Sequence, residues 1–215
     1  MRSKQPTLTH EREQLILDAA QKRFAVYGLT KVTMDEIASD IGLGKATLYY
    51  YFPTKEEVFR RVVQREQEEF LKHVGDIIRS KASASDKLKA YSQRRQRLFT
   101  LLINLNLVTS QTWLDFHPIL NALFKEFADE EMKMLTRILR EGTRRGEFDV
   151  PSPEKVATTV LHTLHGLRLR AVRMTQSPAA PGQNFAELEH EVEHLCCLIL
   201  DGIKKRTNHR KAPTA

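Results

Sequence analysis

Apolar residues recur every three or four positions through most of this chain, which is the period of an amphipathic α-helix. Such stripes predict long helices over residues 9–28, 55–74, 86–107, 120–145, 153–174 and 185–205. No stretch shows the sustained alternation of apolar and polar residues that predicts a half-buried strand. The pattern therefore predicts an all-α fold.

Two shorter helices are predicted between the first two long ones. Thr33 is followed three residues later by Glu36, which is the spacing of a capping box at a helix start. The residues Gly42-Leu43-Gly44 supply a tight turn, and a second short helix is expected from Lys45 to Phe52, before Pro53. Two helices joined by a short turn that contains glycine form a helix-turn-helix, whose second helix enters the DNA major groove.

The run from Thr33 to Phe59 resembles the DNA-binding signature of the TetR family of one-component transcriptional regulators. The residues that carry the resemblance are Thr33, Ile37-Ala38, Ile41-Gly42-Leu43-Gly44, Ala46, Leu48-Tyr49, Tyr51-Phe52 and Lys55-Glu56. Gly44 stands where the family more often has serine, so the second helix loses a side-chain cap. Ala46 replaces a common glycine, and its methyl group slightly limits how closely that helix can approach DNA. The close match covers about the first 60 residues.

The resemblance implies a three-helix headpiece followed by a helical body that binds an effector and forms a dimer. We predict a helix-turn-helix DNA-binding domain at residues 1–53, an effector-binding and dimerisation domain at 54–207 and a flexible basic tail at 208–215. Thr54 can cap the helix that leaves the headpiece. That helix is the natural connection between the DNA reader and the body.

Seven residues of the headpiece region are candidates for contact with DNA: Thr33, Lys45, Ala46, Thr47, Tyr49, Tyr50 and Lys55. Lys45 can reach a phosphate or a guanine edge, and Thr47 can meet a base edge or a thymine methyl group. Tyrosine hydroxyls can bind phosphates, which fix the register without reading sequence. Lys55 lies in the first turn of its helix, where backbone N–H groups also favour a phosphate. Leu48 and Phe52 are assigned to the core instead.

Several polar or aromatic residues are embedded among apolar ones in the body. They are Asn104, Asn106, Thr109, Trp113, Asp115, His117, His162 and His165. One interpretation is an apolar ligand pocket between helices, lined by Leu102, Asn106, Trp113, Phe116, His117, Phe127, His162 and His165. The ordinary interpretation of each single residue, which the sequence favours, is a core aromatic, a satisfied polar group or a helix cap. A Leu- and Phe-rich interior with few buried charges favours a lipophilic effector.

The last two predicted helices each carry an apolar stripe wide enough to need a partner. In the family that the chain resembles, the corresponding helices form a four-helix bundle with a second copy. The predicted dimer interface is Leu164, His165, Leu167, Leu188, Val192, Leu195 and Ile199. A symmetric dimer would read two half-sites of a pseudo-palindromic DNA operator.

Charge adds little to the case for DNA binding. The formal net charge is +7, but much of the excess lies in residues 79–97 and in the tail KKRTNHRK. The beginning of the chain has no apolar signal core, and no apolar run approaches the roughly 18 residues of a membrane span. Adjacent Cys196 and Cys197 cannot join distant segments. We therefore expect a cytoplasmic protein.

Catalysis and metal binding find little support in the residues. The phosphate loop, the G-x-S-x-G elbow and the H-E-x-x-H motif are all missing. Asp115 and His117 could in principle assist Ser110, and His162 with His165 has one half of a zinc spacing. We expect no catalytic residues, no metal and no cofactor.

The function predicted is a dimeric repressor that a lipophilic small molecule releases from its operator. A regulator without an effector, one controlled by a partner, and an activator remain open, as does a helical enzyme or scaffold.

Overall fold

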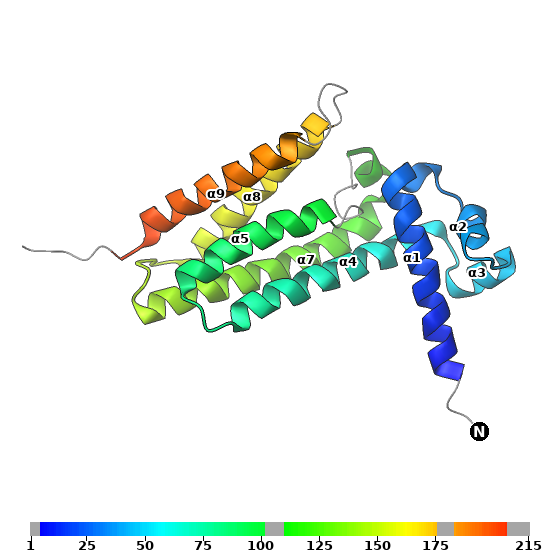
Figure 1. The fold of residues 1–215 in the computed structure, drawn as a ribbon, viewed down its shortest axis with the longest axis horizontal. Coiled ribbons are helices and arrows are strands. Elements are labelled where there is room, and N and C mark those ends of the chain that lie inside the picture. The colour runs from blue at the N-terminus through cyan, green and yellow to red at the C-terminus, as the bar shows by residue number, and fades with distance from the viewer. Residues whose placement is uncertain (1–4, 102–109, 176–182, 206–215) are drawn as a thin grey trace, which may run out of the picture. The chain divides into compact units, whose positions relative to one another are not determined.

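The computed structural model describes residues 5–101, 110–175 and 183–205, and eight α-helices account for most of them (Figure 1). The helices are α1 (Gln5–Lys31), α2 (Met34–Asp40), α3 (Lys45–Tyr51), α4 (Lys55–Arg79), α5 (Ala84–Leu101), α7 (Ser110–Arg145), α8 (Pro153–Thr175) and α9 (Gln183–Ile203). Extended pairing within these residues is a single antiparallel bridge between Phe148 and Lys204. The predicted all-α fold is confirmed.

The chain packs as two compact units. One comprises residues 1–72 and 98–128, and the other comprises residues 73–97 and 129–215. Helices α4, α5 and α7 contribute residues to both units. The predicted division into domains at residues 53 and 54 stays a prediction.

The first unit is built around the apolar face of α1. Ile16, Leu17 and Phe24 are fully buried, and the rings of Phe24 and of Phe59 from α4 are perpendicular, with 5.3 Å between their centroids. The first long helix was predicted to end at Gly28. This glycine has φ 75° and ψ 161°, a conformation open to glycine alone, and it kinks α1 before the helical backbone resumes and ends at Lys31.

Helix α7 corrects one prediction. The helix predicted over residues 120–145 begins earlier, at Ser110, and its backbone is helical through Pro118 for 36 residues in all. A proline inside a helix removes one hydrogen bond and costs about 3 kcal/mol. The buried apolar residues in the second half of α7, which include the fully buried Leu135 and Ile138, offset a cost of that size.

The second unit contains the paired helices α8 and α9, which pack along each other (Figure 1). Gly142 of α7 makes room for Phe148, because a Cβ atom at position 142 would lie 2.2 Å from that ring. The Asp149 amide donates to the Ile203 carbonyl at 2.7 Å, and the Lys205 amide donates to the Glu147 carbonyl at 3.1 Å. These bonds fasten the end of α9 to the connection between α7 and α8.

The interior of the second unit carries more charge than the sequence suggested. Arg95 of α5 and Glu131 of α7 are each 3% exposed, and Arg95 Nε donates to Glu131 Oε1 at 2.6 Å. Lys87 is equally buried against Glu141. The expectation of few buried charges is therefore wrong. A helix stripe read as apolar can contain a charged residue when a partner on another helix neutralises it, and a single sequence does not reveal that partner.

Within the described residues, no helix has the combination of length and apolar composition needed to cross a membrane.

Candidate nucleic-acid interface

A complete capping box starts α2, as predicted. The Thr33 hydroxyl accepts a hydrogen bond from the Glu36 amide at 3.3 Å, and the Glu36 carboxylate accepts one from the Thr33 amide at 2.8 Å. The Thr33 amide is the main reason that the pKa of Glu36 is lowered. The start of α2 is therefore held in place before any DNA arrives.

The turn between α2 and α3 depends on Gly42. Its φ of 65° lies in the left-handed region, which side chains disfavour, and the Leu43 amide beside it donates to the Ala38 carbonyl at 2.9 Å. Gly44 then begins α3 with extended backbone and no side-chain hydrogen bond. The lost cap predicted from the sequence is confirmed.

Helix α3 divides cleanly into an inner and an outer face. Leu48 is fully buried and Phe52 is 4% exposed, as expected for core residues. Lys45, Ala46, Tyr49 and Tyr50 are exposed, and Thr47 is half-buried. Because residues four apart lie one turn apart on a helix, the exposed residues share one face. Five of the seven predicted DNA contacts thus lie on one short helix.

Lys45 is already engaged in an ion pair. Its Nζ lies 2.8 Å and 2.9 Å from the two carboxylate oxygens of Asp35 on α2. The same amino group lies 5.9 Å from the centre of the Tyr49 ring. The hydrogen bond to Asp35 is the main cause of the raised pKa of Lys45. The lysine is therefore held at the outer edge of α3 by a partner that solvent can reach.

The other two predicted contacts lie at the starts of α2 and α4. Thr33 is exposed, although its hydroxyl already serves the capping box. Lys55 is half-buried in the first turn of α4 and donates to the Thr30 carbonyl at 3.4 Å. Thr54 caps that helix by accepting from the Glu57 amide at 3.1 Å, as predicted.

Arg23 of α1 braces the helix-turn-helix from the side. It donates through Nη2 to Asp40 Oδ1 at 2.7 Å and lies 3.5 Å from Glu36. The hydrogen bond from Arg23 is the main cause of the lowered pKa of Asp40. Because these contacts hold α2 against α1, and α3 follows α2 after a tight turn, α3 can enter a DNA groove as part of a rigid body.

Residues 16–62 match the family model described as bacterial regulatory proteins, tetR family. A transcriptional regulator from Cytophaga hutchinsonii is 33% identical, with 89% of this chain and 98% of that one covered and a TM-score of 0.78. The chain belongs to the TetR family of transcriptional regulators.

Two further relatives show how far the likeness of this TetR-family chain extends. The nucleoid occlusion factor SlmA of Vibrio campbellii is 25% identical over 187 residues, which is 83% of this chain and 92% of SlmA. The structure of FadR from Bacillus subtilis in complex with stearoyl-CoA is 22% identical, with coverage of 85% and 96% and a TM-score of 0.68. The second likeness shows the fold alone.

Most of the predicted ligand-pocket residues lie outside the described residues. Leu102 and Asn106 lie outside the described residues altogether. For Trp113, Phe116 and His117 the helical backbone is described but the side chains are not. Phe127 is 6% exposed and packs edge-on against Phe70, with 5.1 Å between ring centroids. His162 and His165 are exposed on α8. The lining of a ligand pocket stays a prediction.

The residues predicted for the dimer interface fall into two groups. Leu164, Leu188 and Val192 are buried within the single chain, where α8 packs on α9. His165 is exposed, and the remaining members, Leu167, Leu195 and Ile199, are half-buried. Leu169 and Leu198 are exposed on the same two helices and were not predicted. The interface itself stays a prediction.

The sequence reasoning missed a buried polar cluster in the second unit. The Tyr91 hydroxyl donates to Glu131 at 2.7 Å beside the Arg95 pair, and burial, followed by the charge of Glu131, raises the pKa of Tyr91. Burial, followed by the charge of Arg95, lowers the pKa of Arg168 to about 10. Although His165 as a whole residue is exposed, partial desolvation of its ring, followed by the charge of Arg168, lowers its pKa to about 4. This cluster therefore holds charged side chains in the interior of the second unit.

Among the described residues, no group of His, Cys, Asp and Glu could hold a metal ion. Cys196 and Cys197 are both free thiols, and only Cys196 is buried.

Proposed function

We propose that this TetR-family protein is a dimeric repressor that a lipophilic small molecule releases from a pseudo-palindromic operator. The observation that carries the DNA-binding part is the outer face of α3. That face gathers Lys45, Ala46, Tyr49 and Tyr50 on a helix whose opposite face is anchored in the core.

Helix α3 would lie in the major groove of the operator. Lys45 would exchange Asp35 for a phosphate or a guanine edge, and Thr47 would meet a base edge. Tyr49 and Tyr50 would contribute phosphate contacts that set the register. Thr33 and Lys55 would hold the backbone at the starts of their helices.

The dimer would form through α8 and α9. The side chains that these helices leave open or half-open to solvent include Leu167, Leu169, Leu195, Leu198 and Ile199, an apolar set suited to a second copy. The two helix-turn-helix elements of the dimer would then read half-sites separated by about one helical turn of DNA (~34–36 Å) or a multiple of it.

The effector would act by favouring a state that does not match the operator spacing. A ligand with equal affinity for both states would shift nothing, so the effector must prefer the released state. The FadR complex with stearoyl-CoA supports a long-chain acyl compound as the kind of molecule to test. The candidate lining residues are the same as those predicted from the sequence. Among them, Phe127 is buried.

A regulator without a small effector is the second candidate. The likeness to a nucleoid occlusion factor over nearly its whole length supports this alternative. The DNA-binding chemistry of the helix-turn-helix would be the same, and it would be the same in an activator.

The DNA-binding part is tested by titrating the protein with the promoter fragment beside its own gene over a range of salt concentrations. Replacing Lys55 by alanine should weaken binding across sequences and make the slope of log K against log salt shallower by about 0.9. Lys72→Ala is the matched control, because Lys72 is an exposed lysine later on α4. Equal slopes for the two variants would remove Lys55 from the interface.

Recognition of the operator's base sequence is tested separately with Thr47→Ala. This variant should change the preference among operator sequences rather than the affinity for all of them, and an identical preference profile would contradict the assignment. Release by a long-chain fatty acid or its coenzyme A thioester in the same titration supports the effector. Retention of the operator under both compounds supports the second candidate.

A further inference from the structure

A basic groove lies in the second unit, formed by residues that the DNA-binding proposal does not use. It is formed by the end of α4, the connection to α5, the start of α5 and the second half of α7, and its volume is about 770 Å³. Eight of its lining residues are cationic and one is acidic. The cationic residues are Arg79, Lys81, Lys87, Lys133, Arg137, Arg140, Arg144 and Arg145.

The acidic residue, Glu141, is neutralised within the groove. Lys87 Nζ lies 3.0 Å and 2.9 Å from its two carboxylate oxygens, and Arg145 Nη2 lies 2.9 Å from one of them. The hydrogen bond from Lys87 is the main cause of the lowered pKa of Glu141. The negative charge of Glu141 is therefore held against two cations instead of opposing an incoming anion.

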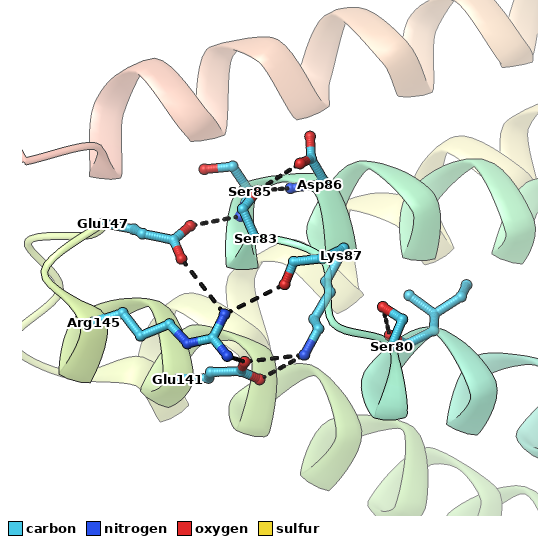
Figure 2. A network of polar contacts seen from close by, with 10 residues as sticks. Ser80, Ser83, Ser85, Asp86, Lys87, Glu141, Arg145 and Glu147 are labelled. Atoms are coloured by element: carbon cyan, nitrogen blue, oxygen red, sulfur yellow. Dashed lines mark hydrogen bonds and ion pairs between the residues drawn. The ribbon is translucent and has the colours of Figure 1, made fainter.

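These contacts also fix the shape of the groove. Arg145 donates to the Ala82 carbonyl at 3.3 Å, and the Glu147 carboxylate accepts from the Ser85 amide at 3.2 Å (Figure 2). Ser83 caps α5 by accepting from the Asp86 amide at 3.1 Å. The end of α7 and the start of α5 are thereby joined, so the site would not have to be ordered by its ligand.

The remaining cations are open to solvent. Lys81, Arg137 and Arg144 are exposed and form no ion pair with another described residue. Three more cations have exposed acidic partners that solvent and ligands can reach. These pairs are Arg79 with Asp76, Lys133 with Glu130, and Arg140 with Glu154.

Four of the cations form a line along α7. Lys133, Arg137, Arg140 and Arg144 follow one another at intervals of four, three and four residues, which places them on one face of the helix. At 1.5 Å per residue, the line is about 16 Å long. A single phosphate would meet only one or two of these side chains, whereas a chain of phosphates could follow the line.

We propose that this groove binds an oligophosphate, meaning a chain of phosphate groups such as that of a nucleoside triphosphate or of inorganic polyphosphate. Five of the eight cations are arginines, whose planar guanidinium groups bind phosphate oxygens in pairs. The volume falls within the range of about 300–1,000 Å³ that is usual for small-molecule sites. This inference does not depend on the proposed repressor function.

The test is calorimetric titration of the full chain with inorganic tripolyphosphate and with magnesium-free adenosine triphosphate. The variant is Arg137→Gln combined with Arg144→Gln. The matched control is Lys89→Gln combined with Arg94→Gln, which removes two exposed charges from α5 in the same unit. We expect the groove variant to bind at least about tenfold more weakly and the control to bind like the natural chain.

Comparing the ligands with one another shows which chemical group the groove recognises. Orthophosphate at matched ionic strength should bind at least about tenfold more weakly than tripolyphosphate, because it meets fewer cations. Tighter binding of the nucleotide would identify a nucleotide as the ligand, and equal binding would identify the phosphate chain itself; both support the site.

Three results would overturn the proposal. The first is no detectable binding of either compound. The second is equal weakening of binding in the groove variant and in the control. The third is a loss of affinity for duplex DNA of unrelated sequence, in the groove variant, as large as its loss of affinity for tripolyphosphate. The last result would make the groove part of a DNA-binding surface. Lys55→Ala should leave tripolyphosphate binding unchanged, so failure of the DNA-binding proposal would be recognised separately.

Discussion

Two ion pairs of almost the same geometry lie in very different surroundings. Lys45 and Asp35 approach to 2.8 Å with 61% of each side chain exposed, whereas Arg95 and Glu131 approach to 2.6 Å with 3% of each exposed. Water and salt screen the first pair, and its members can exchange partners at little cost. Neither member of the second pair can leave without stranding a charge in the interior. The distance alone therefore says nothing about what an ion pair does.

The location of each pair agrees with its expected use. Under the proposed function Lys45 would leave its partner to bind DNA, and the exposed Asp35 is a partner that it can give up. The buried pair is joined by Tyr91, whose hydroxyl donates to the same carboxylate at 2.7 Å. That arrangement fixes one packing of α5 against α7 and makes the pair structural.

The largest effect should follow from breaking the buried pair. Glu131→Gln leaves the Arg95 charge uncompensated, so we expect the free energy of unfolding to fall by about 3–5 kcal/mol. Chemical denaturation measures it. Glu130→Gln, the exposed neighbour on α7, should leave stability unchanged. Replacing both Arg95 and Glu131 by methionine should recover much of the loss, and a double variant as unstable as the single one would contradict this account.

A smaller effect is expected at the capping box, which is exposed yet well ordered. Thr33→Ala removes the acceptor for the Glu36 amide and should cost about 1 kcal/mol in thermal or chemical unfolding. Thr33→Ser keeps the hydroxyl and should retain most of the stability. Equal losses in the two variants would show that the threonine methyl, rather than the hydrogen bond, stabilises the start of α2.

Breaking the exposed ion pair should barely change stability and should act on DNA binding instead. Asp35→Ala removes the competitor of the phosphates for Lys45, so operator affinity should rise at low salt. The salt slope should become steeper by up to about 0.9, because Lys45 would then bind DNA without first leaving a protein partner. Weaker binding by Asp35→Ala would show that Asp35 positions the lysine for contact.

The smallest effect at neutral pH is expected at His165, an exposed residue at the edge of the buried cluster. Its pKa is lowered to about 4 in the folded chain, below the value of 6.5 for an unperturbed histidine. The unfolded chain therefore binds the extra proton first, and stability should decline as the pH falls from about 6.5 toward 4. His165→Gln should lose this part of the decline and match the natural chain above pH 7. Identical pH profiles would contradict the lowered pKa.

The sequence predicted the helix-turn-helix well because every one of its signals is local. The capping box, the left-handed Gly42, the missing cap at Gly44 and the buried Leu48 all depend on residues a few positions apart. Periodicity predicted the long helices for the same reason. It placed the start of one long helix at residue 120, whereas α7 begins at Ser110 and stays helical through Pro118.

The features that sequence reasoning missed all join distant residues. Arg23 meets Asp40 across 17 positions, Arg95 meets Glu131 across 36, and Lys87 meets Glu141 across 54. A charge in a helix stripe looks the same in sequence whether it faces water or a buried partner. Only the line of cations at residues 133–144 could have been found beforehand, from its helical spacing.

The short bridge between Phe148 and Lys204 has a mechanical consequence. Two backbone hydrogen bonds, from Asp149 to Ile203 and from Lys205 to Glu147, hold the last turn of α9. A pulling force applied through the residues after Lys205 would therefore reach these two bonds before it reaches the rest of α9. In single-molecule stretching from this end, the first rupture should free the terminal turn, and α9 should unwind only afterwards.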